Sequence, residues 1–174
     1  MKTEQILPIL RVGAWVVYIG AIVRTVVVAV SFAVHIYEQA KGGSESGTLL
    51  ASLLLMSLLM ASMILYVELW QQVKDVLTNI NLGTPFTMET ARRLVGISYS
   101  LLGLWIIAFI GKNYLHYIQK RMPEVADLTT GYIADLGGGF DVNGILLLNA
   151  GIVYIIAQVF RRGVELQQEN ELTI

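Results

Sequence analysis

One charged residue lies inside an otherwise apolar stretch near the N-terminus, and it is the strongest chemical signal in the sequence. Arg24 falls about halfway along residues 12–37. A charge at the centre of a bilayer costs ~2.5–3.5 kcal/mol on insertion scales, so such a side chain pairs inside the protein or snorkels to lipid phosphate. Polar residues at comparable depth are Ser57, Tyr99, Asn149 and Tyr154. We expect an intramembrane polar site of Arg24, Asn149 and Tyr154, with snorkelling as the alternative.

The other residues that could carry chemistry give weaker signals. Glu68, next to Trp70 at the end of an apolar stretch, is the carboxylate that a proton or cation carrier would use, although ordinary solvation at the interface also explains it. His35 and His116 could ligate a haem between helices, but no other residue supports such a site. The chain has no cysteine, which excludes disulfides, thiolate-ligated zinc and iron–sulfur clusters. We expect no cofactor and no metal.

The sequence contains no motif typical of an enzyme or of a nucleic-acid-binding protein. It contains no Ser/His/Asp grouping, no phosphate-cradling loop and no zinc-protease pattern, so we expect no catalytic activity. The formal net charge of -1 gives no reason to expect direct nucleic-acid binding.

The elements that must position these residues are membrane-spanning helices. The 174 residues are 55% apolar and 14% charged, against ~45–50% and ~25% in soluble domains. Four stretches reach the ~20 residues needed to cross a bilayer, and their spans are about 12–37, 48–70, 93–115 and 142–161. The sequence therefore predicts one domain over residues 1–174, an all-α integral membrane four-helix bundle with antiparallel up-down spans and the lipid bilayer as its main partner.

The distribution of basic residues predicts that both termini are cytoplasmic. With the termini on one side, that side holds seven Lys and Arg residues: Lys2, Arg11, Lys74, Arg92, Arg93, Arg161 and Arg162. The other side holds four: Lys41, Lys112, Lys120 and Arg121. The positive-inside rule then places the termini in the cytoplasm.

The connections between the spans are unequal. Residues 71–92 read as a cytoplasmic helical hairpin, because a helical stripe continues beyond the second span, Gly83 and Pro85 end it, and Thr87 can cap the next helix. Residues 116–141 are predicted to form an acidic, glycine-containing outer loop, and residues 162–174 a cytoplasmic tail whose first part can extend the last helix.

Several short motifs resemble one bacterial family. They are Gly83-Thr84-Pro85-Phe86-Thr87, Arg92-Arg93-Leu94, Phe160-Arg161-Arg162-Gly163 and the ending Glu171-Leu172-Thr173-Ile174. Together they resemble the domain-of-unknown-function family 2975, whose members are four-span membrane proteins of similar length. Genes of that family often lie beside one for a small helix-turn-helix regulator. By analogy, the resemblance implies a membrane partner of a transcription regulator.

These observations lead to a functional hypothesis and one alternative. We expect a multi-pass protein of the bacterial cytoplasmic (inner) membrane that docks a small helix-turn-helix regulator. The candidate docking residues are Pro85, Phe86, Arg92, Arg93, Arg161, Arg162, Glu171, Leu172 and Ile174. The alternative is a small transporter or channel subunit that uses Arg24 and Glu68. Small residues four apart, such as Ala29 and Ala33, suit contacts within one chain or between copies in a homo-oligomer equally.

Overall fold

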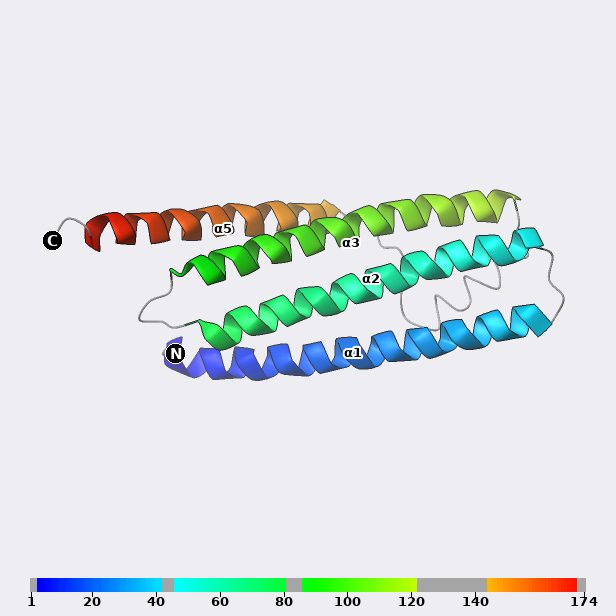
Figure 1. Cartoon of the computed structure of the whole chain (residues 1–174), viewed down its shortest axis with the longest axis horizontal. Helices are drawn as coiled ribbons and strands as arrows, with labels where there is room; N and C mark the ends of the chain where they lie inside the picture. Colours follow the sequence, from blue (N-terminus) through cyan, green and yellow to red (C-terminus); the bar gives the residue numbers. More distant parts are fainter. Residues whose placement is uncertain (1–2, 42–45, 81–85, 122–143, 172–174) are drawn as a thin grey trace.

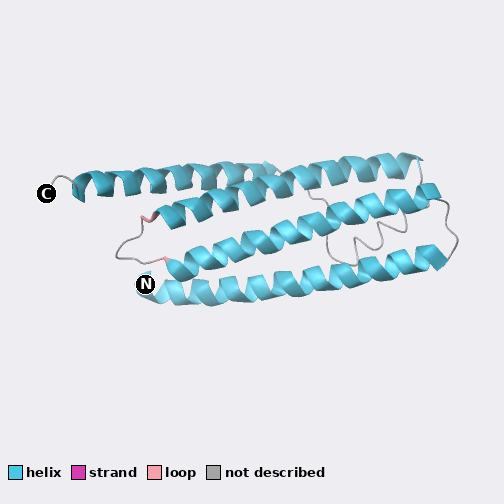
Figure 2. Cartoon of the chain, in the orientation of Figure 1, coloured by secondary structure: helices cyan, strands magenta, loops and turns pink. Residues whose placement is uncertain are grey.

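The described part of the chain is helical almost throughout. The computed structural model describes residues 3–41, 46–80, 86–121 and 144–171, and Figure 1 shows the four long helices in these ranges. Their bounds are Thr3–Lys41 for α1, Ser46–Asn79 for α2, Met88–Arg121 for α3 and Gly144–Glu171 for α5. Only short loop segments beside α2 and α3 interrupt the helices of these ranges (Figure 2). The predicted all-α class with four membrane spans is confirmed.

The helices pack as a row in the order of the sequence. α2 packs against α1 and α3, and α3 packs against α5. Across the described ranges, α1 makes no close backbone approach to α3 or α5, so the row is open at both edges. Successive helices run in opposite directions (Figure 1). One end of the row therefore carries the start of α1, the end of α2, the start of α3 and the end of α5, and we call it the hairpin end.

The outer helices of this row leave most of their apolar surface exposed. In the most apolar window of each helix, 11% of the residues are buried in α1 and in α5, against 33% in α2 and 28% in α3. In water, so much exposed apolar surface would drive further association. In a bilayer the outer helices can face acyl chains, and no closed bundle is needed to hide them. All four helices are long and apolar enough to span a membrane.

The helices are longer than the spans expected from hydropathy. α2 and α3 have 34 residues each, which is about 51 Å at ~1.5 Å per residue, against ~30 Å of hydrocarbon. At the hairpin end, α2 continues to Asn79 and α3 begins at Met88, both within the range 71–92 where the hairpin was predicted. α3 also continues to Arg121, past position 116 where the outer loop was expected to begin, and α5 continues to Glu171. Residues 122–141 of the expected outer loop, and the first two residues of the expected fourth span, lie outside the described residues.

The start of α3 confirms the predicted cap. The backbone N–H of Thr90 donates to Thr87 Oγ1 at 3.1 Å, and Glu89 lies in the first turn. A threonine hydroxyl in this position satisfies a backbone donor that has no partner within the helix. Ile80, just beyond α2, still donates to Val76 O at 3.0 Å.

The best-packed region lies around α2, away from the hairpin end. Its buried residues are Val28, Leu55, Met56, Leu59 and Met63, with Phe32, Met60, Tyr114 and Leu115 packed against them. Two hydrogen bonds between helices support the row, from Tyr114 Oη to Ala51 O at 3.3 Å and from Ser98 Oγ to Ala150 O at 2.9 Å. The framework that holds the hairpin end is thus centred on α2 and α3.

Candidate functional site

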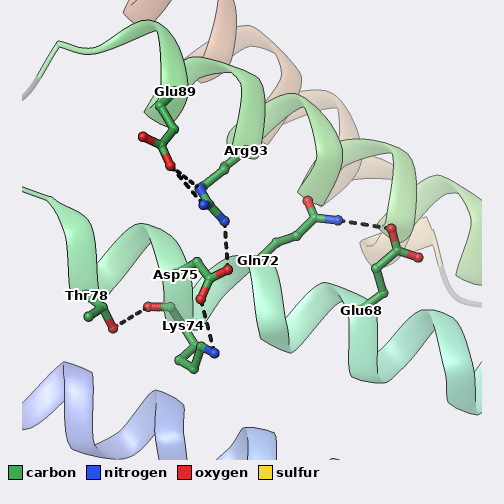
Figure 3. Close-up of polar contacts among 7 residues, drawn as sticks. All are labelled: Glu68, Gln72, Lys74, Asp75, Thr78, Glu89 and Arg93. Carbon is green, nitrogen blue, oxygen red and sulfur yellow. Dashed lines mark hydrogen bonds and ion pairs between the residues drawn. The ribbon is translucent and has the colours of Figure 1, made fainter.

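Arg93 joins α2 to α3 at the hairpin end. Its Nη1 lies 2.7 Å from Asp75 Oδ2 on α2, and its Nη2 lies 2.8 Å from Glu89 Oε1 one turn earlier on α3 (Figure 3). The Arg93 and Asp75 side chains are 30% and 25% exposed, so the contact between them is less screened than that of a fully exposed pair. Arg93, expected as a docking residue, is held by two carboxylates of its own chain.

Lys74 extends this polar network to α1. Its Nζ lies 3.1 Å from Asp75 Oδ1 and also lies 4.6 Å and 4.7 Å from the ring centres of Trp15 and Tyr18. A lysine ammonium over aromatic rings is attracted by their negative faces. Charged and aromatic side chains therefore connect α1, α2 and α3 at one depth, where indole and phenol rings commonly mark a membrane interface.

Arg11 binds the end of α2. Its Nε donates to Leu77 O at 2.7 Å and its Nη2 donates to Ile80 O at 3.4 Å. The last carbonyls of a helix have no partner within it and carry the negative end of the helix dipole. The Arg11 guanidinium donates to these carbonyls and places a positive charge at the negative end of the dipole. Arg11 therefore fixes the end of α2 against α1.

Replacing Arg11 with methionine should loosen the last turn of α2. We expect amide hydrogen exchange to accelerate in the last turn of α2, and the free energy of unfolding to fall by about 1–2 kcal/mol, because charged donors to backbone carbonyls are lost. Lys112→Met removes a charge from an exposed position on α3 and is the matched control. Equal exchange rates in the two variants would contradict the capping role.

Phe86 attaches the hairpin to α5. Its ring centre lies 5.1 Å from that of Phe160, and a Cβ atom placed on Gly163 would lie 2.8 Å from Phe86 Cδ1. Glycine at position 163 therefore makes room for the ring. Phe86, an expected docking residue, thus lies against the part of α5 that carries two others, Arg161 and Arg162.

The basic pair at the end of α5 is partly neutralised. Arg162 Nη1 lies 2.9 Å from Glu165 Oε2, and Arg161 Nε lies 3.6 Å from Glu165 Oε1. Arg161 also lines a cavity of about 310 Å³ between α3 and α5, together with Arg92. Of the other expected docking residues, Glu171 ends α5, and Pro85, Leu172 and Ile174 lie outside the described residues.

The expected intramembrane site of Arg24, Asn149 and Tyr154 is not assembled. Arg24 is partly buried on α1, whereas Asn149 and Tyr154 are exposed on α5. Since α1 makes no close approach to α5, the three side chains do not share a site. Residues at equal depth can meet only on neighbouring helices, and two helices separate α1 from α5 in the row.

Glu68 is exposed and accepts a hydrogen bond from Gln72 Nε2 at 3.3 Å.

The two histidines are also separated. His35 is buried on α1 and His116 is exposed on α3, two helices without close backbone contact. Within the described ranges, no group of three or more His, Cys, Asp or Glu residues could hold a metal ion.

Four residues of the hairpin end have no predicted role at their site: Arg11, Lys74, Asp75 and Gly163. Arg11 and Lys74 contribute to the prediction only as positive charges, and Gly163 only as part of a family motif. Arg11, Lys74 and Asp75 could have been noticed because they lie just outside apolar spans. Gly163 could have been noticed because it is a glycine inside a helical segment, directly after two arginines. None of these signals names a partner, because the partners lie on other helices.

Comparison with known proteins gives the family. The family model described as "Protein of unknown function (DUF2975)" matches residues 36–174. The chain belongs to the DUF2975 family. The match covers α2, α3 and α5, and therefore the DUF2975 segment includes Phe86, the α3–α5 cavity and Gly163. It begins after Arg11 and Arg24, which lie on the earlier part of α1. No curated protein and no solved structure matches this DUF2975 chain.

Proposed function

We propose that this DUF2975 protein is a non-catalytic regulatory partner in the bacterial cytoplasmic membrane. Its hairpin end faces the cytoplasm and docks a small helix-turn-helix regulator. The observation that carries the proposal is the Phe86–Phe160 contact, with ring centres 5.1 Å apart, which brings the segment just before α3 against α5. A shift of either helix would change this contact, which is how a membrane signal could alter the affinity for a partner.

The end of α5 supplies groups suited to such a partner. Leu166 lies beyond the basic pair that marks the membrane boundary, yet it is 47% exposed. Glu165 and Glu169 lie on the same helical turns. Glu165 already contacts Arg161 and Arg162, so the exposed Leu166 is the group that suits an apolar pocket on a partner.

The test is affinity capture from membranes in mild detergent. We expect the intact chain to recover a helix-turn-helix protein, and a chain truncated after Arg162 or carrying Leu166→Ser to recover at most about a tenth as much. Gln167→Ser, at the neighbouring exposed position, is the matched control. Equal recovery by the truncated chain would move docking to the hairpin, and recovery by neither chain would reject the proposal.

The transporter alternative makes a different prediction. Purified protein in liposomes would then show a solute or ion flux that Arg24→Leu abolishes and truncation after Arg162 leaves intact. Under the docking proposal, the two variants have the opposite effects on partner capture, so the experiments separate the two functions.

A further inference from the structure

A cavity opens between α3 and α5 at the hairpin end. Its volume is about 310 Å³, and its lining residues are Met88, Ala91, Arg92, Val95, Ala157, Gln158 and Arg161. Two arginines and a glutamine thus lie beside a small apolar wall. The described lining includes no acidic residue.

The two arginines of this cavity contact carboxylates less closely than the arginines next to them in the sequence. Arg93 contacts two carboxylates at 2.7 Å and 2.8 Å, and Arg162 lies 2.9 Å from Glu165. Within the part of the chain that the structure describes, Arg92 makes no hydrogen bond or ion pair, and the only contact of this kind for Arg161 is the 3.6 Å contact with Glu165. The guanidinium groups of Arg92 and Arg161 are therefore available to an anion from outside the chain.

The depth of the cavity indicates which anion it meets. Arg92 immediately precedes the third apolar stretch, and Arg161 ends the fourth. Val95 and Ala157 lie about one turn further into the apolar part of their helices. The cavity therefore crosses the boundary between headgroup and hydrocarbon. Phospholipid phosphates occupy that level, and basic pockets between spanning helices bind anionic headgroups.

We infer that this cavity binds one anionic phospholipid. Arg92 and Arg161 hold the phosphate by charge-assisted hydrogen bonds, Gln158 donates to a headgroup oxygen, and an acyl chain lies along Val95 and Ala157. A bound lipid would thereby join α3 to α5 next to the Phe86 contact. This inference does not depend on any protein partner, because the purified chain suffices to test it.

The experiment is native mass spectrometry of the purified full chain in mild detergent, titrated with phosphatidylglycerol or phosphatidylcholine. We expect one phosphatidylglycerol to bind at least about tenfold more tightly than phosphatidylcholine. The double variant Arg92→Gln with Arg161→Gln should lose that preference. Each basic residue near a membrane surface strengthens the attraction to anionic lipid, and this variant removes both from the cavity. Arg92→Lys with Arg161→Lys keeps the charges and should retain most of it, which separates loss of binding from loss of folding.

The matched control removes two charges from the other end of the same helix. Lys112→Gln with Lys120→Gln changes the net charge equally at exposed positions of α3 and should bind phosphatidylglycerol as the unmodified chain does. Inorganic phosphate at millimolar concentration should not compete, because it lacks the acyl chain. Equal binding of the two lipids, unchanged binding by the glutamine variant, or full displacement by inorganic phosphate would each overturn the inference.

Discussion

Replacing Gly163 with valine should release Phe86 from α5 and lower the free energy of unfolding by about 1–3 kcal/mol. A Cβ atom at position 163 would lie 2.8 Å from Cδ1 and 3.1 Å from Cγ of the Phe86 ring. These atoms are close to the backbone of Phe86, so the ring can avoid the new side chain only by leaving its contact with Phe160. Thermal unfolding in detergent, followed by circular dichroism, measures the loss.

Two further glycines provide controls for this experiment. Gly151 also lies on α5, and a Cβ atom there meets nothing within 4 Å, so Gly151→Val should leave stability nearly unchanged. A Cβ atom on Gly96 would come still closer to a neighbour, but that neighbour is Oε1 at the mobile end of the Gln72 side chain. We therefore expect Gly96→Ala to cost less than Gly163→Ala. The opposite order would show that Phe86 is not held against α5.

The Gly163 variant also tests the proposed surface. If the Phe86–Phe160 contact joins the hairpin to α5 for docking, Gly163→Val should weaken capture of a helix-turn-helix partner while Gly151→Val does not. Normal capture by a Gly163→Val chain with reduced stability would separate the role of Phe86 in folding from any role in docking.

The sequence predicts the helices and their caps because those signals are local. Long apolar runs specify the four spans, Thr87 with Glu89 specifies the start of α3, and the polar residues after Arg162 are good helix formers. Each of these conclusions depends on residues within a few turns of one another. The basic motifs near positions 92 and 161 also directed attention to the hairpin end.

The contacts between helices could not be predicted in the same way. Arg11 reaches Leu77 O, and Gly163 accommodates Phe86, only because of the axial register of neighbouring helices. The expected site at Arg24 failed for a related reason. Equal depth in the membrane does not bring Arg24 close to Tyr154, because α1 and α5 lie at opposite edges of the row.

Leu55→Ala should be the most costly single truncation in the membrane region, at about 1–3 kcal/mol. Leu55 has 0% exposure and belongs to the cluster that joins α2 to Val28 of α1, with Leu115 of α3 packed against it. In a bilayer the transfer from water contributes little, because the alternative surroundings are also apolar. The cavity and the lost van der Waals contacts remain, and these set the expected cost.

Leu54→Ala is the matched control, because Leu54 is the preceding residue on the same helix and is 56% exposed. Lipid chains can fill the space that its side chain leaves, so we expect a change below about 0.5 kcal/mol. Reversible unfolding in mixed micelles compares the two variants directly. Equal costs would contradict the packing of α1 and α3 on opposite sides of α2. A large difference would show that the stability of the row depends on the packing of its central helices. The hairpin end lies outside that packed region, so a lipid or a partner can change its arrangement without unfolding the row.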